Sequence, residues 1–417
     1  MTSGSDSTVT APVRPATGAR RRLVTLVGPA FVAAVAYIDP GNFATNFESG
    51  AHFGYLLLWV VVLANAVAML LQYLSAKLGV ATGRSLPELC RDSYRRPVVR
   101  ALWFQAELIV IMTDLAELVG GAVALNLLFG FPLLAGGLLI AAASFVILAV
   151  RTVGQRRFEA AIAAAVAVVA VVFLYQTLAA GIAVREAAEG LVPRFDGMSS
   201  VMLAAGMVGA TVMPHAVYLH SALTKERFAP GHGLRRASLL RAQRTDVFLA
   251  MGVAGLINAA MLVAAAGLLY GTGAEASLAG AHAQLSLRAG ESTATLFAIA
   301  LLASGLASSS VGVYAGEIVM QGFLQRRIPL YARRLAAVVP ALVVLGTGME
   351  ATRALVMSQV VLCVGIPFTL LPLVLLTRRA DVMGPWVNRR VTTVLAGCAA
   401  LVITALDGIL VVRTFTA

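Results

Sequence analysis

The sequence predicts an all-α polytopic membrane protein with 11 transmembrane helices. The chain of 417 residues is 59% hydrophobic and only 12% charged, whereas about a quarter of the residues in a soluble domain are charged. Its mean hydropathy is +0.86. Apolar runs of about 20 residues, long enough to cross a bilayer, recur along nearly the whole sequence. Together these observations exclude a soluble globular protein.

The elements follow in order along the chain. Residues 1–23 are rich in Ser, Thr, Pro and Gly and are expected to form a disordered cytoplasmic tail. Residues 24–417 are expected to form one transmembrane transporter domain. We predict spans at about 24–50, 54–80, 101–128, 132–150, 158–184, 198–224, 246–271, 292–323, 332–349, 352–377 and 391–413.

Two five-span blocks and one extra helix account for these spans. The blocks cover about residues 24–184 and 198–377, and the extra helix covers about 391–413. Their first spans, 1 and 6, have opposite orientations and are each interrupted by a proline. A matched pair of breaks in two inverted repeats is the best sequence indication of a transporter's substrate site.

The net charge of +12 reports orientation and not a nucleic-acid partner. With the N-terminus in the cytoplasm, all but five of the 32 Lys and Arg residues fall on the cytoplasmic side of the predicted spans. This is the positive-inside pattern. An odd number of spans then places the C-terminus outside. The excess of Arg over Lys favours a bacterial cytoplasmic membrane.

The first break reads Asp39-Pro40-Gly41-Asn42. Proline has no N–H and frees the carbonyl four residues earlier, here that of Ala36. A broken helix survives in lipid only where it lines a cavity within the protein. The break therefore offers the carboxylate of Asp39 and the amide oxygen of Asn42.

The second break reads Gly209-Ala210-Thr211-Val212-Met213-Pro214-His215. Pro214 frees the carbonyl of Ala210, which we expect to be unpaired. Met213 adds a thioether. Three oxygens and one sulfur, from Asp39, Asn42, Ala210 and Met213, would then face one another at mid-membrane.

This donor set predicts a site for a divalent transition metal ion. Hard oxygen donors alone suit Mg²⁺ and Ca²⁺, whereas a soft thioether favours Mn²⁺ or Fe²⁺. Taken singly, an Asp-Pro-Gly-Asn sequence is usually a turn and a methionine is usually core filler. An ionisable residue in mid-span, however, marks a functional site by default.

At these residues the chain resembles the Nramp family of divalent metal transporters. The two breaks match its most diagnostic segments. Further matches are Thr113-Asp114-Leu115-Ala116-Glu117, Ser308-Ser309-Ser310-Val311-Gly312, Tyr314-Ala315-Gly316 and Ser358-Gln359-Val360. The resemblance covers all 11 spans.

The resemblance implies a LeuT-like fold with helices 1 and 6 discontinuous and proton-coupled uptake of Mn²⁺ or Fe²⁺. It implies metal binding by Asp39, Asn42, Ala210 and Met213, with Gln359 closing around the ion in some states. Relatives that carry Mg²⁺ or Al³⁺ lack this methionine. The chain departs from many members at Ala216, where they have Asn.

Proton coupling requires titratable groups inside the bundle, and span 3 supplies three. Glu107, Asp114 and Glu117 are spaced by seven and three residues and so share one helix face. Three carboxylates in one span are costly unless they face a wet or paired interior. Arg333 and Arg334, at the start of span 9, are candidate counter-charges.

Two histidines in span 6 are further candidates for the proton pathway. His215 follows Pro214 directly, and its ordinary pKa suits proton transfer near neutral pH. It could instead be a third ligand or a core histidine. His220 could extend the route toward the cytoplasm or simply pack. No role is assigned to Asp407 in span 11.

Other functions of the same architecture remain open at this point. One is an organic-solute transporter, but the carboxylate of Asp39 would repel a substrate carboxylate. Another is a Mg²⁺-type carrier, which the thioether of Met213 disfavours. A metal-gated channel is also open, whereas an enzyme is not expected because no H-E-x-x-H motif is present. The expected partners are the metal ion, protons and the lipid bilayer, with no nucleic acid, no obligate protein partner and no permanently bound cofactor.

Overall fold

The computed structural model describes residues 28–416, except 152–154, 229–235, 274 and 327–329. All regular structure in this part of the chain is helical. Eight helical segments are long and apolar enough to cross a membrane, and three shorter apolar helices, Pro29–Ile38, Leu133–Phe145 and Leu335–Gly346, accompany them. The predicted all-helical fold is therefore confirmed, and each predicted span corresponds to a helix or to a pair of half-helices.

The first block of spans runs from α2 to α8. Its elements are α2 (Pro29–Ala34), η1 (Val35–Ile38), α3 (Pro40–Phe53), α4 (Leu58–Thr82), α5 (Leu86–Ser93), α6 (Arg96–Phe129), α7 (Leu133–Arg151) and α8 (Gln155–Ala180). The break between η1 and α3 falls at Asp39, as predicted. Helix α6 begins five residues before its predicted span, because Pro97 in its first turn is a favourable helix start.

The second block and the extra helix follow. Their elements are α9 (Val184–Glu189), α10 (Gly197–Thr211), α11 (Pro214–Arg227), α12 (Arg236–Leu269), α13 (Leu278–Ala289), α14 (Glu291–Leu324), α15 (Leu330–Gly346), α16 (Ala351–Thr377), α17 (Ala380–Met383), η2 (Gly384–Trp386) and α18 (Arg390–Thr416). The break between α10 and α11 falls at Val212 and Met213, so the prediction of two discontinuous spans is confirmed.

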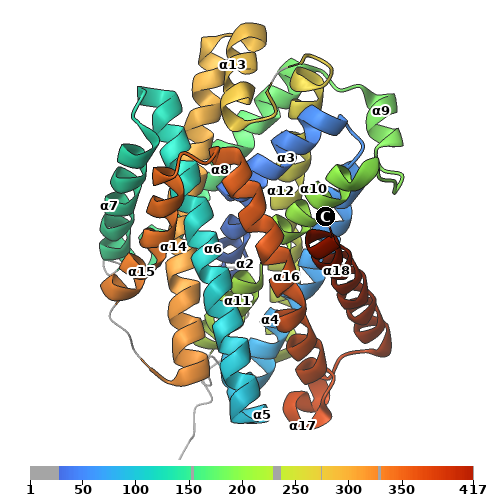
Figure 1. Cartoon of the computed structure of the whole chain (residues 1–417). Helices are drawn as coiled ribbons and strands as arrows, with labels where there is room; N and C mark the ends of the chain where they lie inside the picture. Colours follow the sequence, from blue (N-terminus) through green and yellow to red (C-terminus); the bar gives the residue numbers. More distant parts are fainter. Residues whose placement is uncertain (1–27, 152–154, 229–235, 274, 327–329, 417) are drawn as a thin grey trace, which may run out of the picture.

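The broken spans lie inside the bundle. Most residues of α3, α10 and α11 are buried, above all those next to the breaks, and the longer helices α4, α6, α12, α14 and α16 pack around them. Helix α7 lies at one side of the molecule and α18 at the other (Figure 1). The breaks are therefore enclosed by protein, which is the condition for interrupting a helix in a membrane.

Glycines on the neighbouring helices make room for the breaks. A side chain on Gly120 of α6 would fall on the ring of Pro40, and one on Gly305 of α14 would lie 3.5 Å from the same ring. Similarly, a side chain on Gly209 of α10 would fall on the backbone of Gln359 in α16. These close approaches fix the first break against α6 and α14 and the second against α16.

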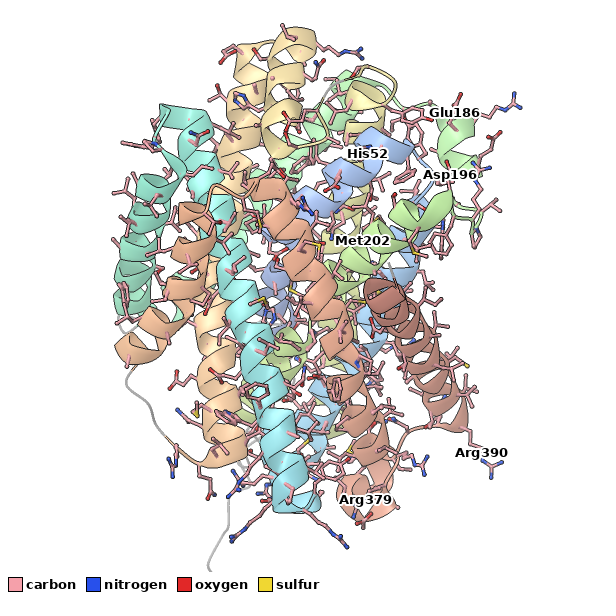
Figure 2. The ribbon with its side chains drawn as sticks, in the orientation of Figure 1. His52, Glu186, Asp196, Met202, Arg379 and Arg390 are labelled. Atoms are coloured by element: carbon pink, nitrogen blue, oxygen red, sulfur yellow. The ribbon has the colours of Figure 1, made fainter. Side chains whose placement is uncertain are left out.

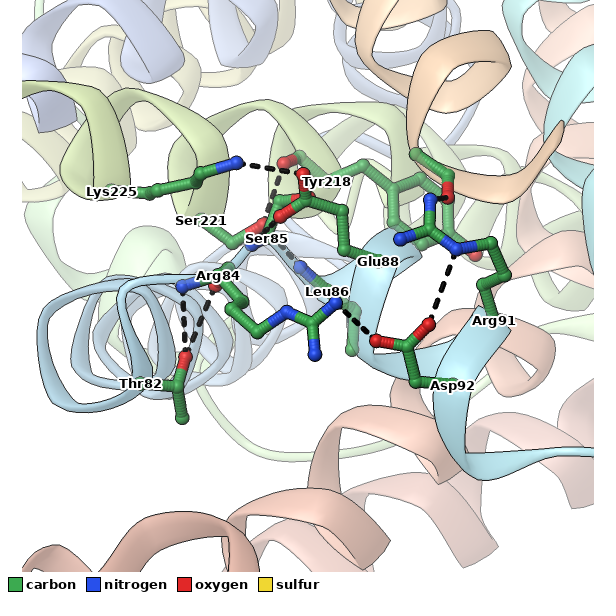
Figure 3. A network of polar contacts seen from close by, with 11 residues as sticks. Thr82, Arg84, Ser85, Leu86, Glu88, Arg91, Asp92, Tyr218, Ser221 and Lys225 are labelled. Carbon is green, nitrogen blue, oxygen red and sulfur yellow. Dashed lines mark hydrogen bonds and ion pairs between the residues drawn. The ribbon is translucent and has the colours of Figure 1, made fainter. Parts of the chain in front are cut away.

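The two ends of the bundle differ in charge. Arg379 and Arg390 lie at one end of the molecule, and His52, Glu186 and Asp196 lie toward the other (Figure 2). At the arginine end, α5 is tied to α11: the Lys225 ammonium donates to Glu88 Oε1 at 2.7 Å, and the Leu86 amide donates to Ser221 Oγ at 2.9 Å (Figure 3). This network holds the second half of span 6 in place.

Candidate metal site at the two helix breaks

Asp39 shapes the first break. It is the N-cap of α3 with extended backbone (φ −77°, ψ 169°), and its Oδ1 accepts a hydrogen bond from the Asn42 amide at 2.9 Å. A carboxylate at a helix N-terminus is stabilised by the free N–H groups and the helix dipole. The residue is fully buried, and within the described residues Oδ2 has no hydrogen-bond partner. One oxygen of the carboxylate is therefore available to a ligand.

Met213 occupies the equivalent place at the second break. It is the N-cap of α11, its backbone is extended (φ −75°, ψ 113°), and its side chain is fully buried. Helix α10 ends two residues earlier at Thr211. The chain thus passes the break in an extended form, and Ala210 and Met213 stand on either side of it.

Asn42 joins the two breaks. Its amide nitrogen donates to Asp39 Oδ1 at 2.8 Å and to the carbonyl of Ala210 at 2.9 Å. Its Oδ1 lies 3.5 Å from the hydroxyl of Thr211. Three of the four predicted ligands therefore meet at one amide group, although Ala210 lies 168 positions after Asn42 in the chain.

The state of the Ala210 carbonyl differs from the sequence-based expectation. We expected this oxygen to be unpaired, but it accepts the hydrogen bond from Asn42. The physical reason is that a buried carbonyl without a partner is costly, and the amide of Asn42 at the opposite break donates to it. The amide hydrogens lie between two oxygens, in the position that a bridging cation would need.

Gln359 packs directly on the first break. It is fully buried on α16, and a side chain on Gly41 would overlap it. Its amide nitrogen donates to Ser358 Oγ at 3.1 Å, whereas its Oε1 has no hydrogen-bond partner among the described residues. A second buried oxygen acceptor is therefore present next to the turn from Asp39 to Asn42.

Two residues that the sequence analysis missed stabilise the first break. Asn258 of α12 donates to the carbonyl of Tyr37 at 2.8 Å, and Ser304 of α14 donates to the carbonyl of Ile38. The expected freed carbonyl was that of Ala36, but the chain tightens into the 3₁₀ turn η1 and the side-chain caps fall on the next two residues. An amide in the middle of the apolar span 7 was the signal that could have identified Asn258.

The acidic residues of α6 lie beside the site. The carboxylates of Asp114 and Glu117 both approach Gly312 of α14: its added side chain would lie 3.4 Å from Asp114 Oδ1 and 3.1 Å from Glu117 Oε1. Both residues are buried, whereas Glu107, two turns away, is half-buried. The side chains of Arg333 and Arg334, the predicted counter-charges, are not among those that the structure describes.

His215 connects the second break to α6. The hydroxyl of Thr113 donates its one hydrogen to the carbonyl of Ile109, so it accepts from His215 Nδ1 at 3.3 Å. This assignment leaves Nε2 as an acceptor, and Nε2 has no hydrogen-bond partner in the described part of the chain. His215 therefore contacts α6 at Thr113, the residue that precedes Asp114 in the chain.

His220 is linked to the first break. Its Nδ1 lies 2.7 Å from Gln72 Oε1, and the Gln72 amide donates to the hydroxyl of Tyr37 at 2.5 Å. All three side chains are buried. The histidine is therefore part of a hydrogen-bonded chain that joins α11 to η1 through α4.

Comparisons with known proteins show which family this chain resembles. The family model described as "Natural resistance-associated macrophage protein-like" (Nramp) matches residues 30–413. A protein of Deinococcus radiodurans named "Divalent metal cation transporter MntH" is 46% identical over 409 residues, which are 97% of this chain and 94% of that protein. One of the same name from Mycobacterium tuberculosis is 50% identical over 393 residues, covering 94% and 92% of the two chains.

Solved structures give the same result. A crystal structure of a manganese transporter variant of Eremococcus coleocola has a TM-score of 0.84 and 30% identity, covering 95% of this chain and 88% of that one. The closed conformation of Mhp1, a nucleobase-cation-symport-1 family transporter, has a TM-score of 0.60 at 17% identity and covers 83% and 77% of the chains. The second likeness shows that the LeuT-like fold is shared. The extent of the sequence and structural matches shows that the chain belongs to the Nramp family.

Proposed function

We propose that this chain is a proton-coupled secondary transporter that imports divalent transition metal ions, Mn²⁺ and also Fe²⁺, by alternating access. The observation that carries the proposal is the amide of Asn42, which joins the carboxylate of Asp39 to the carbonyl of Ala210 between two broken helices. Similar proteins named as divalent metal cation and manganese transporters support the same substrate.

The donors at the breaks support a transition metal. Asp39 supplies one negative charge and an oxygen without a hydrogen-bond partner in the described residues. A cation between Asp39 and Ala210 would replace the two amide hydrogens, and Asn42 would then turn its oxygen toward the ion. Met213 adds the soft donor that Mg²⁺ and Ca²⁺ do not need. Gln359 supplies a further oxygen from α16.

Proton transfer is proposed to follow a separate route beside the metal. The contact between His215 and Thr113 supports a path from the second break to α6. Asp114 comes next in the sequence, and its carboxylate and that of Glu117 approach the same glycine. Glu107, Arg333, Arg334 and His220 are proposed to extend this pathway. Separate metal and proton sites would let the two ions move without competing for one carboxylate.

Alternating access is supported by the placement of the half-helices. Asp39 and Met213 are fully buried, so the site is closed to solvent in this conformation. The tie between α5 and α11 at the arginine end would have to break for ions to leave on that side (Figure 3). We place that end in the cytoplasm of a bacterium, with the N-terminus inside and the C-terminus outside.

The test uses purified protein in liposomes, with Mn²⁺ influx and internal pH followed together. The proposal predicts saturable Mn²⁺ influx accompanied by internal acidification, and loss of both in Asp39→Ala. Influx that does not saturate and moves no protons would instead identify a metal-selective channel. Protein that moves no Mn²⁺ under a proton gradient or a membrane potential would refute the proposed function.

A second experiment isolates the thioether. Met213→Ala should retain some Mn²⁺ flux while Ca²⁺ and Mg²⁺ begin to compete, because only oxygen donors remain. Met207→Ala is the matched control: Met207 is equally buried on α10, but its sulfur accepts a hydrogen bond from Ser49, away from the break. Full discrimination against Ca²⁺ in Met213→Ala would show that sulfur has no part in selectivity.

A further inference from the structure

A cationic cavity lies at the arginine end of the molecule, apart from the metal site. It has a volume of about 680 Å³ and is bounded by α4, α12, η2 and the start of α18. Four cationic side chains line it, those of Lys77, Arg241, Arg244 and Arg389, and none of its lining residues is acidic. Such a concentration of one charge in a concave surface attracts anions.

These four cations have no carboxylate partner within the described residues. The ion pairs found there involve other residues. The Lys77 ammonium donates to Asn388 Oδ1 at 2.8 Å, and the residue is only 8% exposed. Lys77 and Arg389 are close enough for their like charges to repel each other. A buried cation next to another cation is costly unless an anion offsets the charge.

A second, apolar cavity continues from the first. It has a volume of about 390 Å³ and shares Leu70, Tyr73 and Arg244 with the cationic cavity. Its remaining lining is mainly apolar and comprises Met69, Thr245, Val247 and Phe248. The charged cavity therefore opens directly into an apolar groove between α4 and α12.

The surface of α12 places this groove at the edge of the membrane. Arg241, Arg244 and Phe248 follow one another at helical spacing on one face. Phe248 and Leu256 are 67% and 73% exposed, which is expected of a helix face that contacts lipid tails. Trp386 lines the cationic cavity, and Trp is enriched at the membrane–water interface.

We propose that these adjoining cavities bind one anionic phospholipid. The headgroup phosphate occupies the cationic cavity among Lys77, Arg241, Arg244 and Arg389, and an acyl chain lies in the apolar groove beside Phe248. Basic pockets between membrane helices on the cytoplasmic side suit lipid phosphates. The apolar groove selects a phospholipid over a free phosphate. The proposal does not depend on which ion the protein transports.

The test measures lipid retention by the full chain in detergent, using native mass spectrometry. The probes are phosphatidylglycerol and phosphatidylcholine with identical acyl chains. Phosphatidylglycerol should bind as a single tight adduct. Arg241→Gln/Arg244→Gln/Arg389→Gln should weaken it by about a hundredfold, since each of the three cations near a membrane surface contributes about fivefold. Arg95→Gln/Arg96→Gln/Arg100→Gln, which removes equal charge from exposed arginines outside the cavity, should leave it unchanged.

Two further arms separate the sources of phosphate. Thr245→Trp fills the apolar groove without changing the charge and should displace phosphatidylglycerol. Glycerol 3-phosphate, which has the headgroup charge but no acyl chains, should fail to compete at equal concentration. The proposal is overturned if both triple variants lose phosphatidylglycerol equally, if Thr245→Trp retains it, or if glycerol 3-phosphate displaces it as well as the lipid does.

Discussion

Asn258 is predicted to hold the first helix break in place although it is not a metal ligand. Its amide nitrogen donates to the carbonyl of Tyr37 at 2.8 Å, and its oxygen accepts from Asn46 at 3.0 Å. Both partners are buried. The substitution Asn258→Ala leaves the Tyr37 carbonyl without this donor. In the described part of the chain it leaves the Asn46 amide nitrogen with only the thioether of Met261, at 4.0 Å.

The size of the effect follows from these two bonds. A buried polar group that loses its partner costs about 1–3 kcal/mol, so the variant should lose about 2–6 kcal/mol of folding stability. At about 2 °C per kcal/mol, the lower end of the range for single domains, the melting temperature should fall by about 4–12 °C. Mn²⁺ affinity should also fall by about tenfold or more, because the turn at Asp39 is less firmly held.

Thermal unfolding in detergent, followed by tryptophan fluorescence, and Mn²⁺ titration calorimetry measure both effects. Thr245→Ala is the control on the same helix, because among the described residues its hydroxyl bonds only to the Arg241 carbonyl in the preceding turn of α12. That variant should change stability by about 0.5 kcal/mol or less. If Asn258→Ala melts and binds Mn²⁺ as the control does, Asn258 does not hold the first break by capping the Tyr37 carbonyl.

Three other substitutions test the packing of Pro40, the proton route and the tie between α5 and α11. Gly120→Val should displace the ring of Pro40, on which its side chain would fall. Mn²⁺ binding should be lost while circular dichroism shows an unchanged helix content. Normal Mn²⁺ binding would show that Pro40 does not need the space beside Gly120. Glu117→Gln should retain Mn²⁺ binding by calorimetry but abolish proton movement in liposomes, and acidification equal to that of the parent would remove Glu117 from the proton route. Burial raises the pKa of Glu88, but the hydrogen bonds from Lys225 and the Ser85 amide outweigh it and hold that pKa below its ordinary value of 4.5. The tie to α11 is therefore present above pH 4.5 and is lost as the pH falls through the folded-state pKa. Hydrogen exchange in residues 85–93 should therefore accelerate at this low pH, and in Glu88→Gln it should accelerate at pH 7 as well. Asp381→Asn, which breaks an exposed ion pair outside this network, should leave hydrogen exchange in residues 85–93 unchanged.

The sequence predicted the fold because its signals are local. Apolar length and the placement of Lys and Arg determine the spans. Proline marks the breaks through its missing N–H. These properties need no knowledge of which helices become neighbours. For this reason the positions of Asp39 and Met213 at the ends of half-helices could be predicted from single segments.

What could not be predicted depends on contacts between distant segments. Asn258 and Ser304 cap carbonyls more than 200 residues away in the sequence. The pairing of Ala210 with Asn42 likewise needs both breaks in the same place. The slot for Pro40 is made by glycines on two further helices. No local pattern encodes these long-range pairings, although the intramembrane polar residues that take part in them are recognisable.

Both helix breaks are proposed to bind one and the same dication. Anomalous scattering from crystals grown with Mn²⁺ would test this proposal most directly, because it locates the metal independently of any transport assay. We expect one intramembrane peak within bonding distance of the Asp39 carboxylate, the Ala210 carbonyl and the Met213 sulfur. A peak between Asp114 and Glu117 instead, or a Mn²⁺ ion at Asp39 with the Met213 sulfur beyond bonding distance, would contradict it.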